Sequence, residues 1–164
     1  AQPVDENAVP SKFGASDVQD LNWVQLLNAY TCTECGRCTS SCPANQTGKK
    51  LSPRKIMMDT RDRMEEVGRN IDANKGVFVP DNKSLLNDYI TPEELWACTS
   101  CNACVEECPV SISPLSIIMD MRRYLVMEQS AAPMPLNAMM TNIENNGAPW
   151  QFSPADRGNW IHED

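Results

Sequence analysis

The chain contains a single histidine, His162, among its 164 residues. No Ser/His/Asp set, glycine-rich phosphate loop or paired carboxylate site stands out, so the usual groups of acid–base and nucleophilic catalysis are missing. We interpret His162 as a solvated terminal residue, because a Rieske-type or other metal site would need further ligands beside it. The chain by itself is therefore not expected to be a catalyst.

Long apolar runs and basic residues are also scarce. No stretch is apolar for long enough to cross a membrane, and no signal-peptide pattern opens the chain, so we expect no membrane-spanning segment in it. With 14 Lys and Arg against 22 Asp and Glu, the formal net charge is −8, which argues against nucleic acid as a partner. A protein partner with a basic surface that steers association is the expectation instead.

The chain has instead eight cysteines, all of which fall inside two copies of one pattern. The copies are Cys32-Thr-Glu-Cys35-Gly-Arg-Cys38-Thr-Ser-Ser-Cys42-Pro43 and Cys98-Thr-Ser-Cys101-Asn-Ala-Cys104-Val-Glu-Glu-Cys108-Pro109. Both read C-x2-C-x2-C-x3-C-P, the run that binds iron–sulfur clusters in bacterial ferredoxins. The cysteine spacing therefore predicts two [4Fe-4S] clusters.

The fourth cysteine of such a run ligates the other cluster. The first three thiolates of each run lie on a tight loop, whereas the fourth follows a helical turn later and points away. We therefore predict crossed ligation, with three ligands from one run and the fourth from the other. The first cluster is assigned to Cys32, Cys35, Cys38 and Cys108, and the second to Cys98, Cys101, Cys104 and Cys42.

Disulfides and zinc are the alternative interpretations of eight cysteines. Four cysteines crowded into each short run would strain disulfides formed within it. Zinc sites usually use two C-x2-C knuckles separated by a longer loop, which a triple run does not provide. Iron–sulfur clusters are thus favoured, and thiolate ligands indicate a reducing compartment such as the cytoplasm.

Helix-start signals surround the first cysteine run. Ser16 and Gln19 form a capping-box pattern that predicts a helix leading to Cys32. Ser52-Pro53 then predicts a helix over about 53–72, followed by a connector over 73–90 with one short helical turn.

The second run repeats this order. Thr91-Pro92 with Glu94 predicts a helix just before Cys98, and Ser113-Pro114 predicts a long helix after the run. The two halves match part for part, which predicts an all-α fold with two pseudo-symmetric halves and the clusters between them.

The ends of the chain are expected to be simpler. Residues 1–15 are predicted to be a flexible lead-in, 16–130 the dicluster domain and 131–164 a tail. The tail has a helix over Leu136–Asn146, a last helix start at Ser153-Pro154, and three apolar anchors that should dock on this domain or on a neighbour. These anchors are Trp150, Phe152 and Trp160.

Three further interpretations concern side chains away from the cysteines. Arg61, Arg63, Glu65 and Glu66 are predicted to form a solvated helix face. Methionines such as Met57, Met58, Met119, Met121, Met139 and Met140 are favoured as fillers of the core over a soft partner surface. Gly36 is either a point of close approach to a cluster or an ordinary turn glycine, and the sequence leaves both open.

Three segments resemble a known family: AYTCTECGRCTSSCPANQTGKKLSPRKIMMDTRDRM, ELWACTSCNACVEECPV and NIENNGAPWQFSPADR. Helix fills the gap between the runs, which is similar to the α-helical ferredoxin of the iron–sulfur subunits of succinate dehydrogenase and fumarate reductase. More closely, residues 15–160 resemble the dicluster domain of bacterial Fe–S oxidoreductases related to the C and D subunits of heterodisulfide reductase. The resemblance implies two complete four-iron clusters.

The resemblance also implies a function. The chain is expected to be an electron-transfer component of an oxidoreductase, relaying single electrons between a flavoprotein and a quinone- or disulfide-reducing module. That family often has a membrane region before the domain and a cysteine-rich CCG domain after it, so a place at the cytoplasmic face of a membrane is expected. The alternative is an interaction domain stiffened by redox-inert clusters. Disulfide reduction by the chain alone is disfavoured, because no ninth cysteine is present.

Overall fold

The computed structural model describes residues 12–162, which form helices and turns without a β-strand. The predicted all-α class is confirmed. The helices are α1 (Trp23–Thr31), α2 (Arg37–Ser40), α3 (Pro43–Gln46), α4 (Pro53–Ala73), α5 (Pro92–Ala97), α6 (Ala103–Glu106), α7 (Pro114–Met127) and α8 (Met134–Asn146), with 3-10 helices at Val18–Asp20 and Pro154–Ile161. Two compact units divide the chain, one ending at Gln129 and the other beginning at Ser130.

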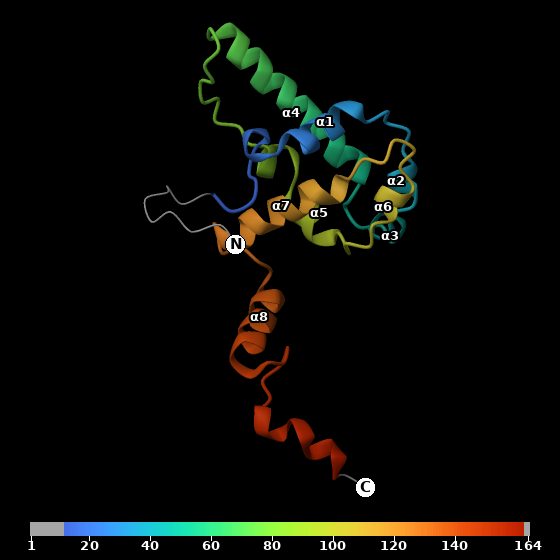
Figure 1. The fold of residues 1–164 in the computed structure, drawn as a ribbon, viewed down its shortest axis with the longest axis vertical. Coiled ribbons are helices and arrows are strands. Elements are labelled where there is room, and N and C mark those ends of the chain that lie inside the picture. Colours follow the sequence, from blue (N-terminus) through green and yellow to red (C-terminus); the bar gives the residue numbers. More distant parts are fainter. Residues whose placement is uncertain (1–11, 163–164) are drawn as a thin grey trace. The chain divides into compact units, whose positions relative to one another are not determined.

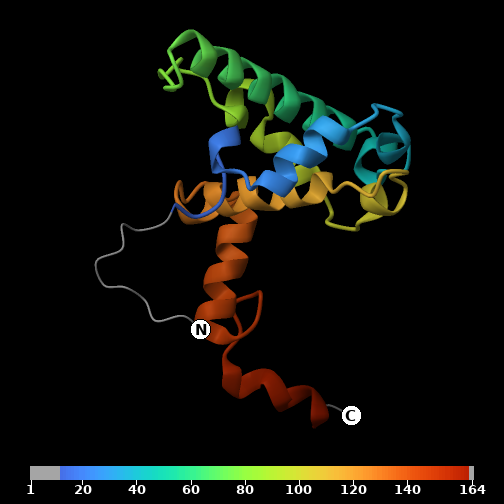
Figure 2. The same cartoon turned by 45° about the horizontal axis from the view of Figure 1, so that its top comes forward.

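The first unit is built on its two longest helices, α4 and α7, which contact each other (Figure 1). Helix α1 packs on α4, and α5 packs on α7. The short helices α2, α3 and α6 gather at one end of this unit, where α2 contacts α6 (Figures 1 and 2). The two cysteine runs therefore meet at this end.

Three of the predicted helix starts are confirmed. Thr91 and Glu94 form a reciprocal capping box, in which Oγ1 of Thr91 accepts the N–H of Glu94 at 3.4 Å and the Glu94 carboxylate accepts the N–H of Thr91 at 2.9 Å. Ser52 and Ser113 accept backbone N–H groups in the same way at the starts of α4 and α7. A proline at the first helical position follows each cap, where its missing N–H costs nothing.

The predicted start at Ser16 is wrong. Asp17 caps only the 3-10 helix Val18–Asp20. The carboxylate of Asp20, the last residue of that helix, accepts the N–H of Asp17. The chain then becomes extended at Leu21, and a second capping box at Asn22 starts α1. Two successive capping boxes, Asp17–Asp20 and Asn22–Gln25, stand in this sequence, and the second one opens the α-helix because the backbone is extended at Leu21 between them.

Residues 12–15, predicted as part of a flexible lead-in, pack against α7, while residues 1–11 lie outside the described part of the chain. Ala15 is buried and its N–H donates to the carbonyl of Asp120 at 3.1 Å. Gly14 has φ of +76°, and a Cβ there would lie 2.2 Å from that carbonyl oxygen and 2.5 Å from the Tyr124 nitrogen. Only glycine allows so close an approach.

Helices α4 and α7 bury matching positions counted from their first prolines. The third and fourth residues after Pro53 are Ile56 and Met57, and those after Pro114 are Ile117 and Ile118. All four side chains are at most 1% exposed. The two halves therefore share a register as well as an order of elements.

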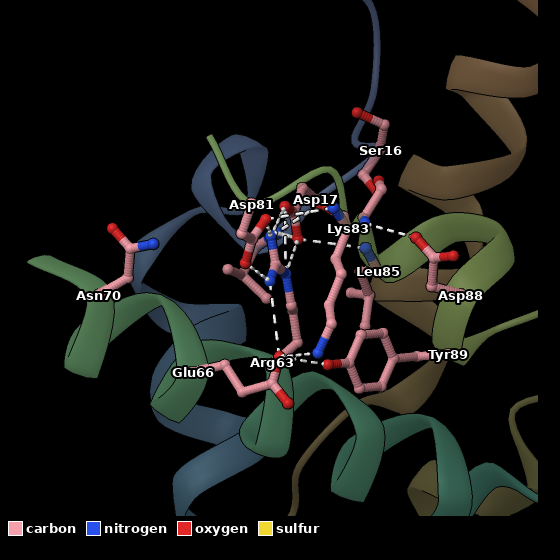
Figure 3. Close-up of polar contacts among 12 residues, drawn as sticks. Ser16, Asp17, Arg63, Glu66, Asn70, Asp81, Lys83, Leu85, Asp88 and Tyr89 are labelled. Atoms are coloured by element: carbon pink, nitrogen blue, oxygen red, sulfur yellow. Dashed lines mark hydrogen bonds and ion pairs between the residues drawn. The ribbon is translucent and has the colours of Figure 1, made fainter. Parts of the chain in front are cut away.

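The predicted solvated face of α4 needs one correction, because Arg63 is fully buried. Its guanidinium donates to both carboxylate oxygens of Asp17, to both of Asp81 and to the carbonyl of Lys83 (Figure 3). These partners come from the segment before α1 and from the connector after α4. A buried charge is stable when it is paired and hydrogen-bonded in this way, and the partners are too distant in sequence for a helix pattern to reveal.

The other apolar predictions have mixed outcomes. Met57 and Met121 are buried, but Met119 and Met140 are 42% and 41% exposed, so the methionines are core residues only in part. The connector makes the expected single turn at Leu85–Tyr89, an irregular one that buries its two leucines.

In the second unit the last 3-10 helix begins at Pro154, as predicted, and α8 begins two residues before the expected Leu136. The side chains of Trp150, Phe152 and Trp160 are exposed. Their docking on this domain or on a neighbour stays a prediction.

Candidate iron–sulfur site

The loops that carry the two cysteine runs have the same backbone form. Glu34 and Ser100, each directly before the second cysteine of its run, have φ of +58° and +56°. Gly36 and Asn102, two residues further on, have φ of +81° and +62°. A Cβ on Gly36 would meet nothing closer than the Arg54 side chain at 3.8 Å, so the left-handed turn accounts for this glycine, and asparagine fills the same role in the second run.

A hollow at the meeting point of α2 and α6 is lined by cysteines of both runs. The space along its lining that is free of protein atoms amounts to about 350 Å³, open solvent included. Its cysteines are Cys32, Cys35, Cys38, Cys104 and Cys108. The structure thus brings together all four residues assigned to the first cluster.

The cysteines assigned to the second cluster are less closely gathered. Cys104 is buried, and burial followed by the neighbouring thiols of Cys98, Cys38 and Cys42 raises its pKa to about 11. Cys42 is 7% exposed, whereas Cys101 is exposed, and hydrogen bonding led by the Ala103 N–H lowers the pKa of the Cys101 thiol. Cys42 therefore lies within the electrostatic range of Cys104, across the boundary between the runs.

Cys38 likewise interacts with thiols of both runs. Burial raises the pKa of Cys38, and the thiols of Cys32 and Cys108 raise it further. Each thiol in such a crowded group resists ionisation, because the neighbouring thiolates would repel its charge. A bound metal centre compensates that charge, so the thiols lose their protons together when it binds. The crowding therefore prepares these residues for a polynuclear centre.

The donor geometry also bears on the alternatives. All eight cysteines are free thiols in this structure. Within residues 12–162, no three Cys, His, Asp or Glu side chains converge closely enough to hold a single metal ion. Thiols of both runs around one hollow are the donors that an iron–sulfur cluster takes. The residues present fit iron–sulfur ligation.

Sequence reasoning missed the arginines around the cysteines. Arg54 lines the hollow, and Arg61 pairs with the Glu34 carboxylate. Arg122 donates to the backbone carbonyls of Leu95 and Cys98. Burial lowers the pKa of Arg122, although an arginine stays protonated at neutral pH. The equal spacing of Arg61 and Arg122 from the first prolines of α4 and α7 was the available signal.

Comparison with known proteins decides the family. The model of the 4Fe-4S dicluster domain matches residues 31–112, half of the chain. The chain belongs to this family. The dicluster domain binds two [4Fe-4S] clusters, so the predicted cofactors are confirmed, and the chain is an iron–sulfur electron-transfer domain.

Several curated proteins are similar over much or nearly all of the chain. The probable iron-sulfur-binding oxidoreductase FadF of Bacillus subtilis is 36% identical over 92% of this chain and 25% of its own length. The EtfAB:quinone oxidoreductase of Syntrophomonas wolfei is 35% identical over 92% of this chain and 24% of its own length. The C subunit of the ferredoxin/F(420)H(2)-dependent CoB-CoM heterodisulfide reductase of Methanosarcina acetivorans is 32% identical over 65% of this chain and 52% of its own length.

The predicted resemblance to heterodisulfide reductase-like Fe–S oxidoreductases is therefore confirmed. The chain spans about a quarter of the length of the first two relatives. In the part of the chain that the structure describes, no helix is long and apolar enough to cross a membrane.

Proposed function

We propose that the chain relays single electrons between a flavoprotein and a quinone- or disulfide-reducing module of a larger Fe–S oxidoreductase. When bound, the two clusters supply one-electron acceptor sites. The chain's own residues hold them: Cys32, Cys35, Cys38 and Cys108 for the first cluster, and Cys98, Cys101, Cys104 and Cys42 for the second. The observation that carries the proposal is the hollow lined by cysteines of both runs.

Crossed ligation would tie the two halves of the domain together. A fourth ligand taken from the other run makes each half depend on its counterpart, so the two sites stay at a fixed separation while electrons pass. Cys35 and Cys101, the second cysteine of each run, are exposed. The exposed loops offer one place of entry and one of exit, as a relay between two partners requires.

The proposed partners draw on the relatives and on charge. One relative is named for EtfAB and a quinone, and another for a heterodisulfide. The formal charge of −8 favours partners with basic docking surfaces, whose association should slow as salt rises. We place the protein in the cytoplasm or at the cytoplasmic face of a membrane, with the acceptor module in another part of the protein or in a partner chain.

Reductive titration tests the relay. The purified protein should contain about eight iron and eight sulfide per chain, and both clusters should take up one electron each reversibly, with interacting electron spin resonance signals. A reduced electron-transferring flavoprotein, used as the probe donor, should bleach the visible absorbance of the oxidised protein within seconds. Clusters that stay oxidised at every applied potential would support the structural alternative instead.

The ligand assignment has its own test in serine variants. If Cys42 serves the cluster of Cys98, Cys101 and Cys104, then Cys42→Ser should damage that cluster and spare the neighbouring one. Its spin resonance spectrum should then match that of Cys101→Ser. A match to Cys35→Ser would show that each run holds its own cluster.

A further inference from the structure

Two arginines occupy equivalent places beside the two cysteine runs. Arg61 and Arg122 are each the eighth residue after the first proline of α4 and α7. That register is the one in which Ile56 matches Ile117 and both are fully buried. The fold therefore brings one guanidinium to each cysteine run. Arg61 interacts electrostatically with the thiol of Cys32, and Arg122 with that of Cys98, which are the first cysteines of the two runs.

The two guanidinium groups differ in their partners. Arg61 forms an ion pair with the Glu34 carboxylate and a second one, at 3.8 Å, with the carboxylate of Asp62. The residue equivalent to Glu34 in the second run is Ser100, whose hydroxyl lies 3.5 Å from Arg122. A hydroxyl group accepts a hydrogen bond without neutralising the charge, so the positive charge of Arg122 is retained.

Arg122 is fixed in place by neutral groups. It donates to the carbonyls of Leu95 and Cys98, and its guanidinium lies 4.9 Å from the centroid of the Trp96 ring. The adjacent Ser100 N–H donates to Sγ of Cys98 at 3.4 Å. A half-buried charge held this way is poorly screened by solvent and acts directly on its surroundings.

We propose that Arg122 raises the reduction potential of the cluster bound by Cys98, Cys101 and Cys104, and that the residue before the second cysteine decides whether the helix arginine acts in this way. Positive charge near a cluster stabilises its reduced, more negative form, and amide hydrogen bonds to ligand sulfur act in the same direction. In the first run the carboxylates of Glu34 and Asp62 offset the charge of Arg61. The inference rests on the proposed ligand assignment and goes beyond it, because it makes the two equivalent sites electrostatically unequal.

Other charges surround both runs and are kept constant in the test. Arg37 and Arg54 are exposed near the first run, and Glu106 and Glu107 are exposed in the second. These groups contribute to the absolute potentials of the two clusters. The proposal concerns how each potential moves when one residue changes, so each cluster is compared only with itself.

The experiment is a potentiometric titration of the intact holoprotein, followed by electron spin resonance. Cys101→Ser identifies which of the two midpoints belongs to the second cluster. Arg122→Gln should move that midpoint to more negative potential, by on the order of a tenfold change in the reduction equilibrium, which is about 59 mV for one electron. Arg122→Lys, which keeps the charge, should restore most of the loss.

Exchanging the residue before the second cysteine of each run, Glu34 or Ser100, gives variants that keep both arginines. Ser100→Glu should lower the midpoint of the second cluster, and Glu34→Ser should raise that of the first. The double variant Glu34→Gln/Arg61→Gln removes a neutral pair and should leave the first midpoint unchanged. Iron content and helical circular dichroism confirm that each variant is folded and loaded.

The outcomes separate this inference from the proposed function. Wild-type protein without two reversible midpoints would overturn the relay and the inference together. The inference alone would be overturned if both midpoints are reversible but the midpoint of the second cluster moves, in Arg122→Gln and in Ser100→Glu, by less than a twofold change in the reduction equilibrium. A shift in Arg122→Gln that lysine does not reverse, with no shift in Ser100→Glu, would show that Arg122 acts through loop position rather than charge, and would also overturn it.

Discussion

The buried Arg63 offers the sharpest test of what holds the first unit together. Its side chain has 0% exposure, and the two carboxylates that accept its hydrogen bonds, Asp17 and Asp81, have side chains 17% and 24% exposed. Replacement by methionine keeps the aliphatic volume but removes every donor of the guanidinium. The Arg63 guanidinium holds the pKa of Asp81 at about 2, which shows how strongly this carboxylate depends on its partner.

The expected cost follows from the burial. Removing one partner of a buried ion pair costs about 3 to 5 kcal/mol, because the remaining charges keep their desolvation without their counter-charge. Arg63 joins α4 to the segment before α1 and to the connector, so its replacement removes the hydrogen bonds that link three parts of the unit. For a domain of this size the predicted loss corresponds to a fall in Tm of about 6 to 20 °C.

Thermal unfolding of the anaerobic holoprotein, followed by helical circular dichroism at one scan rate, measures this loss. The matched control is Arg69→Met on the same helix, where the arginine side chain is 73% exposed and pairs with Glu65. This surface pair should contribute less than about 1 kcal/mol. If the Tm values of Arg63→Met and Arg69→Met fall by the same small amount, the buried contacts of Arg63 do not stabilise the unit.

Three other predictions concern backbone space, pH and iron. Gly14→Ala should lower Tm clearly more than Gly48→Ala, because both glycines have φ of +76° but only Gly14 has backbone atoms within 2.5 Å of a new Cβ; equal losses would contradict the close approach. Burial and then the Glu66 carboxylate raise the pKa of Tyr89 to about 12, so its stabilising contribution is present below pH 10 and should be lost between about pH 10 and 12. Tyr89→Phe should remove that pH dependence, and a tyrosinate titration that this variant leaves unchanged would refute it. Iron chelation should unfold the first unit cooperatively, whereas unchanged helical circular dichroism after chelation would show that the core suffices alone.

The cysteine runs and the caps were readable from the sequence because their signals are local. A capping box needs only four residues, and Thr91 with Glu94 contains the whole signal. The cluster-binding run is likewise complete within one loop, so the cofactor could be predicted before any tertiary contact was known. The family comparison confirms that part of the prediction.

Long-range pairing explains what the sequence could not show. The residues next to Arg63 in the sequence are those of a surface helix, and its local ion pair with Glu66 at 3.7 Å fits that pattern. The carboxylates that accept its hydrogen bonds, those of Asp17 and Asp81, reach it only through the folded connector and the segment before α1. Exposed helix residues and buried ion pairs share the same sequence pattern, because both are charged and regularly spaced. The same limit hid the difference between Arg61 and Arg122, which depends on loop residues that precede them by more than twenty positions.

The contacts of Arg63 and the cysteine loops involve different residues and can therefore vary separately. Arg63 is the tenth residue after Pro53, and the groups that accept its hydrogen bonds, on Asp17, Asp81 and Lys83, all lie outside the two cysteine runs. Arg63→Met should therefore retain the iron content and spin resonance spectrum of the wild type below its Tm. Iron loss from the folded variant would show that the contacts of Arg63 also position the cysteine ligands, and the two could then no longer be treated as independent.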